Sequence, residues 1–320
     1  MPLMFDMPLE ELQTYRGTNP APPDFNDFWD AGLEVMRAVD PQVELIPAEF
    51  QTSFADCSHM YFTGVGGARI HAKLLRPRNI SQTHPAVLMF HGYSSSSGDW
   101  SSMLGYVAQG FSVAALDCRG QGGLSEDRGG VTGGTLQGHI IRGLDGSPEN
   151  LLFRQIFLDT AQLAGLVMDM SDVDQNRLGA TGGSQGGGLT LACAALEPRI
   201  KRAAPVFPFL CDYQRVWEID QAKDAYVELQ EYFRKFDPLH EREKVIFEKL
   251  GYIDVQHLCP RIRGQVLMST GLMDTICPPS TQYAAYNKIS SPKTIDLYPD
   301  YEHEDLPGQA DRVFQFMMRL

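Results

Sequence analysis

A serine within a run of glycines is placed where its hydroxyl could act as a nucleophile. The run is Gly182-Gly183-Ser184-Gln185-Gly186, preceded by a short apolar segment and followed by helix-forming residues 189–196. The pattern G-x-S-x-G between a strand and a helix is typical of a sharp turn that exposes the serine hydroxyl. It also places Ser184 at a helix N-terminus, where free N–H groups favour developing negative charge. The simpler alternative is that Ser184 only caps the helix.

A serine nucleophile needs an imidazole to take its proton and a carboxylate to orient that imidazole. Both follow apolar runs that are typical of buried strands: Asp274 comes after residues 266–270, and His303 comes after residues 295–298. Parallel sheets place their sites outside the carboxyl ends of the strands. We therefore expect Ser184, Asp274 and His303 to meet there as a catalytic triad, in the order serine, acid, histidine.

Other histidines and carboxylates compete for these roles. Among the histidines, only His303 lies late in the chain, just past a strand and downstream of an equally placed acid. Asp274 is favoured over the other acids by its position after a strand. The competing residues are His59, His71, His84, His91, His139, His240 and His257 for the base, and Asp254, Asp296, Asp300 and Asp305 for the acid.

The tetrahedral intermediate of acyl transfer needs two donors for its oxyanion. One donor is expected to be the backbone N–H of Gln185, the residue after the nucleophile. The other comes from the loop after an earlier strand, and His91-Gly92-Tyr93 follows the apolar run 86–90. We expect the backbone N–H of Tyr93 to be this second donor, although an ordinary turn at the end of a strand would give the same pattern.

The elements that position these residues alternate along the chain. Continuous apolar runs are typical of strands buried on both faces. Strands and helices in alternation predict one α/β domain over residues 1–320, doubly wound around a mostly parallel sheet. The predicted strands are 86–90, 112–116, 178–181, 202–206, 264–270 and 294–298, and the predicted helices are 100–109, 151–170 and 186–196.

Three segments depart from this alternation. Residues 1–84 predict helices over 9–19 and 25–36, with Asp24 as the N-cap of the second, followed by antiparallel strands at 43–46, 60–62 and 70–74. Residues 120–146 are rich in glycine and long for a loop, which is usual for a functional segment. Residues 211–258 are charged and predict a helical insertion, of the kind that caps an active site or contacts another subunit.

Composition excludes several classes of function. The chain has 320 residues and a formal net charge of −13, from 27 Lys and Arg against 40 Asp and Glu. This charge disfavours nucleic acid and anionic membranes as partners. No apolar stretch approaches the roughly 20 residues needed to cross a bilayer. Because the N-terminus lacks the features of a secretory signal, we expect a soluble cytoplasmic protein.

The cysteines give no sign of a metal or a disulfide framework. All six are scattered without a C-x-x-C pair, and no histidine completes a zinc set. We expect mostly buried free thiols, because cysteine packs as a small hydrophobic residue. No metal and no cofactor are predicted.

Three ordered motifs resemble one family: the acetyl xylan esterase and cephalosporin C deacetylase family of α/β hydrolases, carbohydrate esterase family seven. The motifs are Arg119-Gly120-Gln121, the serine motif at 182–186, and His303-Glu304. Longer stretches are also similar, namely Phe209 to Asp212, Phe236 to Pro238, Gly251 to Asp254, Gly271 to Asp274 and Cys277 to Thr281. The likeness runs from about Leu3 to the C-terminus.

The resemblance implies the same triad and the same oxyanion donors. Arg119 and Gln121 are then structural supports beside the site, although the residues alone would also allow a substrate clamp. Members of the family remove O-acetyl groups from small acetylated sugars and from the cephalosporin side chain, and several transfer the acetyl group to peroxide. The resemblance further implies a homohexamer with active sites facing an internal cavity, in which segments 120–146 and 211–258 would make subunit contacts.

Two rival functions remain open at this stage. An amidase or oligopeptidase could use the same triad, although such enzymes usually carry extra domains or a charged specificity clamp. A non-catalytic scaffold on a degenerate hydrolase fold is the other rival, and an intact serine, acid and histidine in order argues against it.

Overall fold

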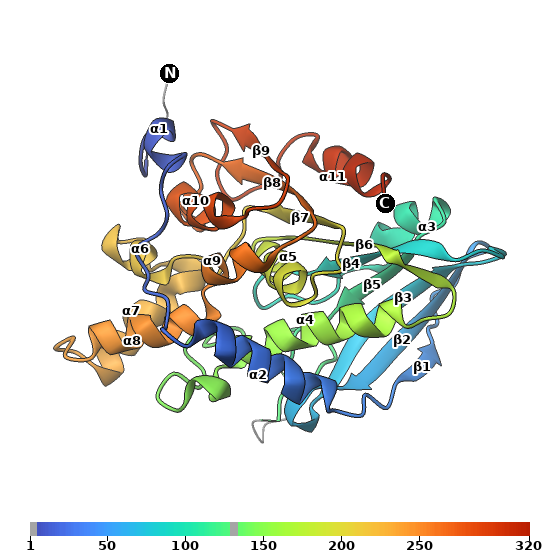
Figure 1. Cartoon of the computed structure of the whole chain (residues 1–320), viewed down its shortest axis with the longest axis horizontal. Coiled ribbons are helices and arrows are strands. Elements are labelled where there is room, and N and C mark those ends of the chain that lie inside the picture. Colours follow the sequence, from blue (N-terminus) through green and yellow to red (C-terminus); the bar gives the residue numbers. More distant parts are fainter. Residues whose placement is uncertain (1–4, 129–133) are drawn as a thin grey trace.

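The computed structural model describes residues 5–128 and 134–320, which form a nine-stranded sheet in the order β1-β2-β3-β5-β4-β6-β7-β8-β9 (Figure 1). Three of the glycines that make segment 120–146 unusual, Gly129, Gly130 and Gly133, lie outside the described residues, as does the start of the N-terminal segment, residues 1–4. The strands are β1 Glu44–Pro47, β2 Ala55–Thr63, β3 Arg69–Pro77, β4 His84–Phe90, β5 Ser112–Leu116, β6 Val173–Gly183, β7 Arg202–Val206, β8 Gln265–Gly271 and β9 Lys293–Tyr298.

The sheet is parallel from β5 through β4 and β6 to β9, and antiparallel at its N-terminal side. Strands β1, β2 and β3 pair antiparallel, and β3 joins β5 antiparallel. Strand β5 is buried along its whole length and β4 almost so, as expected for apolar runs with helices on both faces. The predicted fold class, a doubly wound and mostly parallel sheet with an antiparallel extension, is confirmed.

Two layers of helices cover the sheet, so that the strand side chains alternate between two cores. Leu88 and Ala114 face the larger core, under α2, α4 and α5. Val87 and Val113 face the smaller core, under α3 and α11. The helices are α1 Leu9–Leu12, α2 Phe25–Arg37, α3 Leu104–Ala108, α4 Leu152–Met168, α5 Gln185–Leu196, α6 Tyr213–Glu218, α7 Val227–Phe236, α8 Glu243–Leu250, α9 Val255–Leu258, α10 Pro279–Lys288 and α11 Gln309–Met317. Single 3-10 turns lie at Val65–Gly67, Trp100–Met103, Pro148–Asn150, Asp224–Tyr226, Gly251–Ile253 and Cys259–Arg261.

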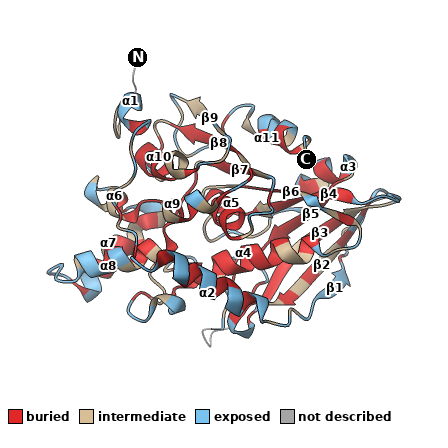
Figure 2. Ribbon diagram, viewed as in Figure 1, coloured by how far each residue is buried: buried red, intermediate tan, exposed pale blue. Residues whose placement is uncertain are grey.

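Burial is greatest where α5, the helix that follows Ser184, meets the sheet (Figure 2). Every residue of α5 is buried, and α4 beside it is buried on nearly all sides. Helix α2 is amphipathic and buries only one face, with Trp29 fully inside. The turn that begins α5 is therefore held by buried elements that exclude water.

The N-terminal segment differs from its prediction in two places. Helix α1 ends at Leu12, well short of the predicted Asn19. The chain leaves the helix because the residues that follow bind Asp212 instead. The Asp212 carboxylate accepts hydrogen bonds from the Tyr15 hydroxyl at 2.8 Å and from the backbone N–H of Asn19 at 2.8 Å. Asp24 does precede α2, but its side chain makes no cap; it accepts from the Tyr252 hydroxyl at 2.6 Å instead.

The two other unusual segments have the character that the sequence predicts. Residues 211–258 form α6 to α9 with short 3-10 turns between them. The described part of 120–146 contains no helix or strand, so it is a long irregular segment. All six cysteines are buried free thiols, as predicted. None of the helices in the described part of the chain is both long and apolar enough to span a membrane.

Candidate active site

Ser184 lies at the tight turn between β6 and α5, with φ 56° and ψ −120°. A non-glycine residue in this region is strained by about 1–3 kcal/mol, and such strain is concentrated at functional sites. The turn requires its glycines: a Cβ would stand 2.5 Å from the Phe90 carbonyl oxygen at Gly182, and 2.1 Å from the same atom at Gly186. The backbone N–H of Ser184 donates to the Val206 carbonyl at 3.0 Å, which fixes the turn to β7.

Asp274 and His303 are brought into direct contact at the ends of β8 and β9. The Asp274 Oδ2 to His303 Nδ1 distance is 2.8 Å. The carboxylate is fully buried, and its Oδ1 accepts from the backbone N–H groups of Ile276 at 2.9 Å and Cys277 at 2.7 Å. The His303 side chain keeps 17% of its surface exposed, so a buried acid orients an imidazole that faces solvent.

Ser184 is placed beside this pair through Cys277. Burial raises the pKa of the Cys277 thiol, and the neighbouring Ser184 hydroxyl offsets a part of that rise. Its Sγ, an Asp274 carboxylate oxygen and a His303 ring nitrogen all lie within 4.8 Å of one another. No hydrogen bond joins Ser184 directly to His303 within residues 5–128 and 134–320. Catalytic hydrogen bonds are often long without substrate and tighten in the substrate complex.

Cys277 is a competing nucleophile that sequence reasoning did not consider. Burial is the main cause that raises the pKa of its thiol well above the ordinary value, and the charge of Asp274 adds to this effect. The thiolate is the reactive form of cysteine. A fully buried, protonated thiol is therefore a poorer nucleophile here than Ser184, which occupies the strained turn.

The same three side chains could also be considered as metal ligands, since Asp274, Cys277 and His303 offer atoms of the right kind. The Asp274 carboxylate is already engaged, because Oδ1 accepts two backbone N–H bonds and Oδ2 faces His303 and the Gln282 amide at 3.4 Å. Since its oxygens serve these donors, the arrangement fits an oriented imidazole better than a metal cage.

Neither of the two expected oxyanion donors has a protein acceptor in the described part of the chain. The backbone N–H groups of Tyr93 and Gln185 make no hydrogen bond to any acceptor in the described chain. Tyr93 lies in the loop after β4, and Gln185 is the first residue of α5. Two free backbone N–H groups, one of them on the residue after Ser184, are the kind of donors that a developing oxyanion needs.

Gln121 connects these two donors. Its side-chain amide pairs with that of the buried Gln185, with Nε2 to Oε1 distances of 2.9 and 3.0 Å. Its Oε1 also accepts from the backbone N–H of Ser94 at 2.9 Å. Gln121 therefore ties the loop after β4 to the start of α5, which fits the support role expected for it.

Arg119 is buried and points into the framework. Its guanidinium pairs with both oxygens of Asp159 on α4, at 2.7 and 2.6 Å, and donates to the Val65 carbonyl at 3.1 Å. Arg119 is only 2% exposed. A side chain so enclosed fits a support rather than a substrate clamp.

The Tyr93 side chain adds a link that the sequence did not indicate. Its hydroxyl donates to Glu228 on α7, whose other oxygen accepts the backbone N–H groups of Ile140 at 2.8 Å and Ile141 at 3.1 Å. Burial raises the pKa of the Glu228 carboxyl. The insertion, the glycine-rich segment and the loop after β4 thus converge on one buried carboxyl group.

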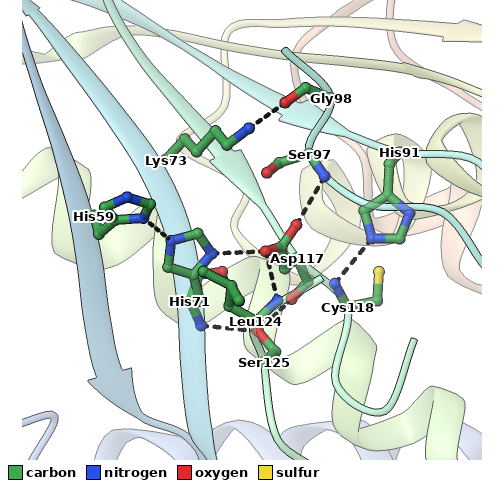
Figure 3. A network of polar contacts seen from close by, with 10 residues as sticks. All are labelled: His59, His71, Lys73, His91, Ser97, Gly98, Asp117, Cys118, Leu124 and Ser125. Atoms are coloured by element: carbon green, nitrogen blue, oxygen red, sulfur yellow. Dashed lines mark hydrogen bonds and ion pairs between the residues drawn. The ribbon is translucent and has the colours of Figure 1, made fainter. Parts of the chain in front are cut away.

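A second histidine and aspartate pair joins β3 to the segment just after β5 (Figure 3). His71 Nδ1 is 2.6 Å from Asp117 Oδ2, and His71 Nε2 is 2.8 Å from His59 Nδ1. The nearby Ser125 hydroxyl contacts the His71 backbone rather than its ring. Asp117 holds the backbone N–H of Ser97 at 2.7 Å, so this network braces the loop after β4.

Four further competitors, His91, Asp254, Asp296 and His240, make contacts that are structural. His91 accepts the backbone N–H of Cys118 at 3.0 Å. Asp254 is buried and caps α9, and burial, with the neighbouring charge of Asp212, raises the pKa of its carboxyl. Asp296 pairs with Arg312 at 2.6 Å, and His240 pairs with Glu243 at 2.9 Å on the surface. None of these four contacts the half-buried Ser184 in the described part of the chain.

The strand order and the strained serine turn at the carboxyl end of β6 define the class: the protein is an α/β hydrolase. The fold is shared by an alpha/beta hydrolase from Penicillium sp. sh18 at only 18% identity, with a TM-score of 0.56 over 82% of this chain and 98% of that one. The acetyl xylan esterase (AXE1) family profile matches residues 1–320. The chain belongs to this family of carboxylic ester hydrolases, as its motifs predict.

The relatives agree with this membership. Acetyl xylan esterase 1 from Thermoanaerobacterium sp. JW/SL YS485 is 60% identical, with a TM-score of 0.96, covering 98% of this chain and 99% of that one. An acetyl xylan esterase from Paenibacillus sp. R4 is 34% identical, with a TM-score of 0.92 and the same coverage. Acetyl esterase Axe7A from Xylanibacter ruminicola is 26% identical over 88% of this chain, which spans 63% of that relative's length.

Proposed function

We propose that this protein is a serine esterase that removes O-acetyl groups from small acetylated sugars, such as xylo-oligosaccharides, and from cephalosporin C-like compounds. The observation that carries the proposal is the strained turn at Ser184 beside the Asp274–His303 pair. Membership of the acetyl xylan esterase family and the names of its relatives support the acetyl group and the sugar.

The first half of the reaction forms an acetyl-enzyme. The Ser184 oxygen bonds to the acetyl carbonyl carbon while His303 takes the hydroxyl proton. The backbone N–H groups of Tyr93 and Gln185 stabilise the oxyanion. The bond to the sugar oxygen then breaks, and His303 returns the proton to that oxygen, so a neutral sugar leaves.

The second half reverses these steps with water. Water gives a proton to His303 as its oxygen bonds to the acetyl carbon, and the same two N–H groups hold the second oxyanion. The bond to Ser184 breaks as His303 returns the proton to the serine oxygen, and acetate leaves. Asp274 keeps its negative charge throughout and holds the imidazole in the tautomer that the reaction needs.

The Ser184→Ala variant tests the nucleophile. We expect kcat for 4-nitrophenyl acetate to fall by at least about a thousandfold, because the triad acts as a unit, with an unchanged unfolding transition. A fluorophosphonate should label the parent protein and a Ser290→Ala control, which alters an exposed serine, but not Ser184→Ala. Retained labelling and rate in Ser184→Ala would defeat the assignment.

The substrate class needs its own test. We expect deacetylation of acetylated xylo-oligosaccharides and of cephalosporin C, little turnover of octanoyl esters, and no cleavage of an aminoacyl anilide. Efficient cleavage of the anilide would favour the amidase alternative. The solved peptidases that resemble this chain do so at 15% identity, which shows the fold alone.

The proposal includes a homohexamer in the cytoplasm. Six buried free thiols suit a reducing compartment. The hexamer rests on the family resemblance alone. Light scattering coupled to gel filtration is expected to give six times the 35.6 kDa chain mass, and a monomer would contradict it.

A further inference from the structure

A cavity of about 480 Å³ adjoins the candidate active site on the side of α3 and α11. Gly183, one residue before the nucleophile, lines it, and so does Asp305, two residues after His303. Phe207 lies between the cavity and the imidazole, with its ring centroid 4.5 Å from that of His303. The cavity is therefore separated from the imidazole by one aromatic ring.

Three aromatic side chains line the cavity: Tyr106, Phe207 and Phe314. Tyr106 and Phe314 pack against each other with centroids 4.9 Å apart, and both line the cavity together with Phe207. Aromatic faces suit ligands with a flat apolar side, such as the C–H face of a pyranose ring.

Four polar side chains around the cavity have no partner in the described part of the chain, whereas the hydroxyls of Ser102 and Thr181, which also line it, donate to the carbonyls of Asp99 and Ala204. The side chains of Tyr106, Asp305, Gln309 and Asp311 line it, and they make no hydrogen bond to any residue within 5–128 and 134–320. Carboxylates and amide oxygens accept from hydroxyl groups, and a phenol can donate or accept. Apolar rings with unengaged polar groups at the rim match a ligand with one apolar face and several hydroxyls.

The proton transfer from His303 to the sugar oxygen places the sugar on the side of the site where the cavity lies. His303 must protonate the departing sugar oxygen, so that oxygen lies within hydrogen-bond reach of its imidazole. Phe207 packs against the same imidazole and forms a wall of the cavity. The remainder of the sugar chain therefore leaves the catalytic centre next to Phe207.

We propose that this cavity binds the sugar residue next to the acetylated one, with Phe207, Tyr106 and Phe314 against its ring and the rim side chains on its hydroxyls. This inference rests on the proposed function, because it places the leaving group by means of His303. It assigns preference for oligosaccharides to residues outside the triad.

The Tyr106→Phe variant removes one hydroxyl and keeps the packing. We expect kcat/KM for acetylated xylotriose to fall about fivefold, the size of one lost uncharged hydrogen bond, and the 4-nitrophenyl acetate rate to stay within twofold. The matched control is Tyr283→Phe, which alters another buried tyrosine, on α10, that does not line the cavity. It should change neither rate.

Binding is measured separately from catalysis, with unacetylated xylotriose titrated by NMR into full-length Ser184→Ala. We expect saturable binding that weakens about fivefold when Tyr106→Phe is added, and further with Gln309→Ala. No saturable binding, or binding that neither change weakens, overturns the inference. An equal loss for both substrates in Tyr106→Phe also overturns it. The proposed function fails by a different result, an active Ser184→Ala variant.

Discussion

At the residue scale, the thiol of Cys277 is the chemical competitor of the serine hydroxyl. Its burial and raised pKa keep it protonated. We expect Cys277→Ala to lower kcat for 4-nitrophenyl acetate by less than about tenfold, far less than the loss expected at a nucleophile. A loss as large as that of Ser184→Ala would show that the thiol takes part in the chemistry.

For Arg119, a support role and a substrate-clamp role predict different effects of substitution. Its ion pair with Asp159 is almost fully buried, at 3% and 1% side-chain exposure. Removing one partner of such a pair costs about 3–5 kcal/mol, because the other charge stays buried. We therefore expect Arg119→Ala to unfold at markedly lower urea concentration, whereas Arg119→Met with Asp159→Leu recovers much of the loss.

The clamp alternative predicts a different pattern for the same residue. If Arg119 is a support, the folded fraction of Arg119→Lys has nearly the KM of the parent for acetylated xylose. If Arg119 is a substrate clamp, Arg119→Lys has a raised KM and the same stability as the parent. Measuring KM and the urea midpoint on the same samples separates the two.

Each candidate site residue is indicated by a local rule in the sequence, and the catalytic roles of these residues stay predictions. The glycines around Ser184 and the strand ends before Asp274 and His303 are visible in the sequence. The sequence did not indicate that Cys277, Phe207 and Glu228 contact residues of the candidate site. Their contacts join residues distant in the chain, and no spacing rule marks a thiol, a ring or a carboxyl group that meets its partner only after folding.

At the scale of elements, the loop after β4 is held from three sides. Gln121 holds Ser94, Asp117 holds Ser97, and Glu228 on α7 holds the Tyr93 hydroxyl. A donor that must meet an oxyanion is effective only when its position is fixed beforehand. The insertion therefore contributes to the geometry of the site through one hydrogen bond.

The Tyr93→Phe variant tests this link. We expect a loss of about 1–3 kcal/mol in the free energy of unfolding, because a buried carboxyl oxygen of Glu228 loses its hydrogen-bond donor. The kcat value should fall by less than tenfold, since the proposed oxyanion donor is the backbone N–H, which phenylalanine keeps. An unchanged urea midpoint would contradict the link.

Elements were predicted well where burial sets the pattern and poorly where a distant residue does. The apolar runs of β4 and β5 are continuous because helices cover both faces. The end of α1 was wrong because Asp212, nearly two hundred residues away, accepts hydrogen bonds from Tyr15 and Asn19. No local propensity contains that information.

At the scale of the whole molecule, buried histidines make stability depend on pH. Burial, the main cause, lowers the pKa of His139 to about 4, and that of His257 to about 3. Between these values and the ordinary pKa of about 6.5, the unfolded chain binds more protons than the folded one. The stability that these two histidines contribute is therefore fully present above about pH 6.5 and is lost as the pH falls toward 4.

Calorimetry on His139→Phe checks this dependence. We expect the fall in Tm between pH 6.5 and pH 4 to be smaller than in the parent by about 2–4 °C, since phenylalanine has no proton to gain. The control is His240→Gln, which alters an exposed histidine paired with Glu243. A His139→Phe curve that parallels the parent would assign the acid sensitivity to other groups.

The left-handed backbone of Ser184 has a consequence for how far such a protein can be made robust. Glycine adopts positive φ without a clash, so we expect Ser184→Gly to melt above the parent by about 2–4 °C, while losing the esterase rate. Selection for heat tolerance and selection for turnover would then pull in opposite directions at this one codon. Gains in thermostability must come from positions elsewhere, where robustness and chemistry do not compete.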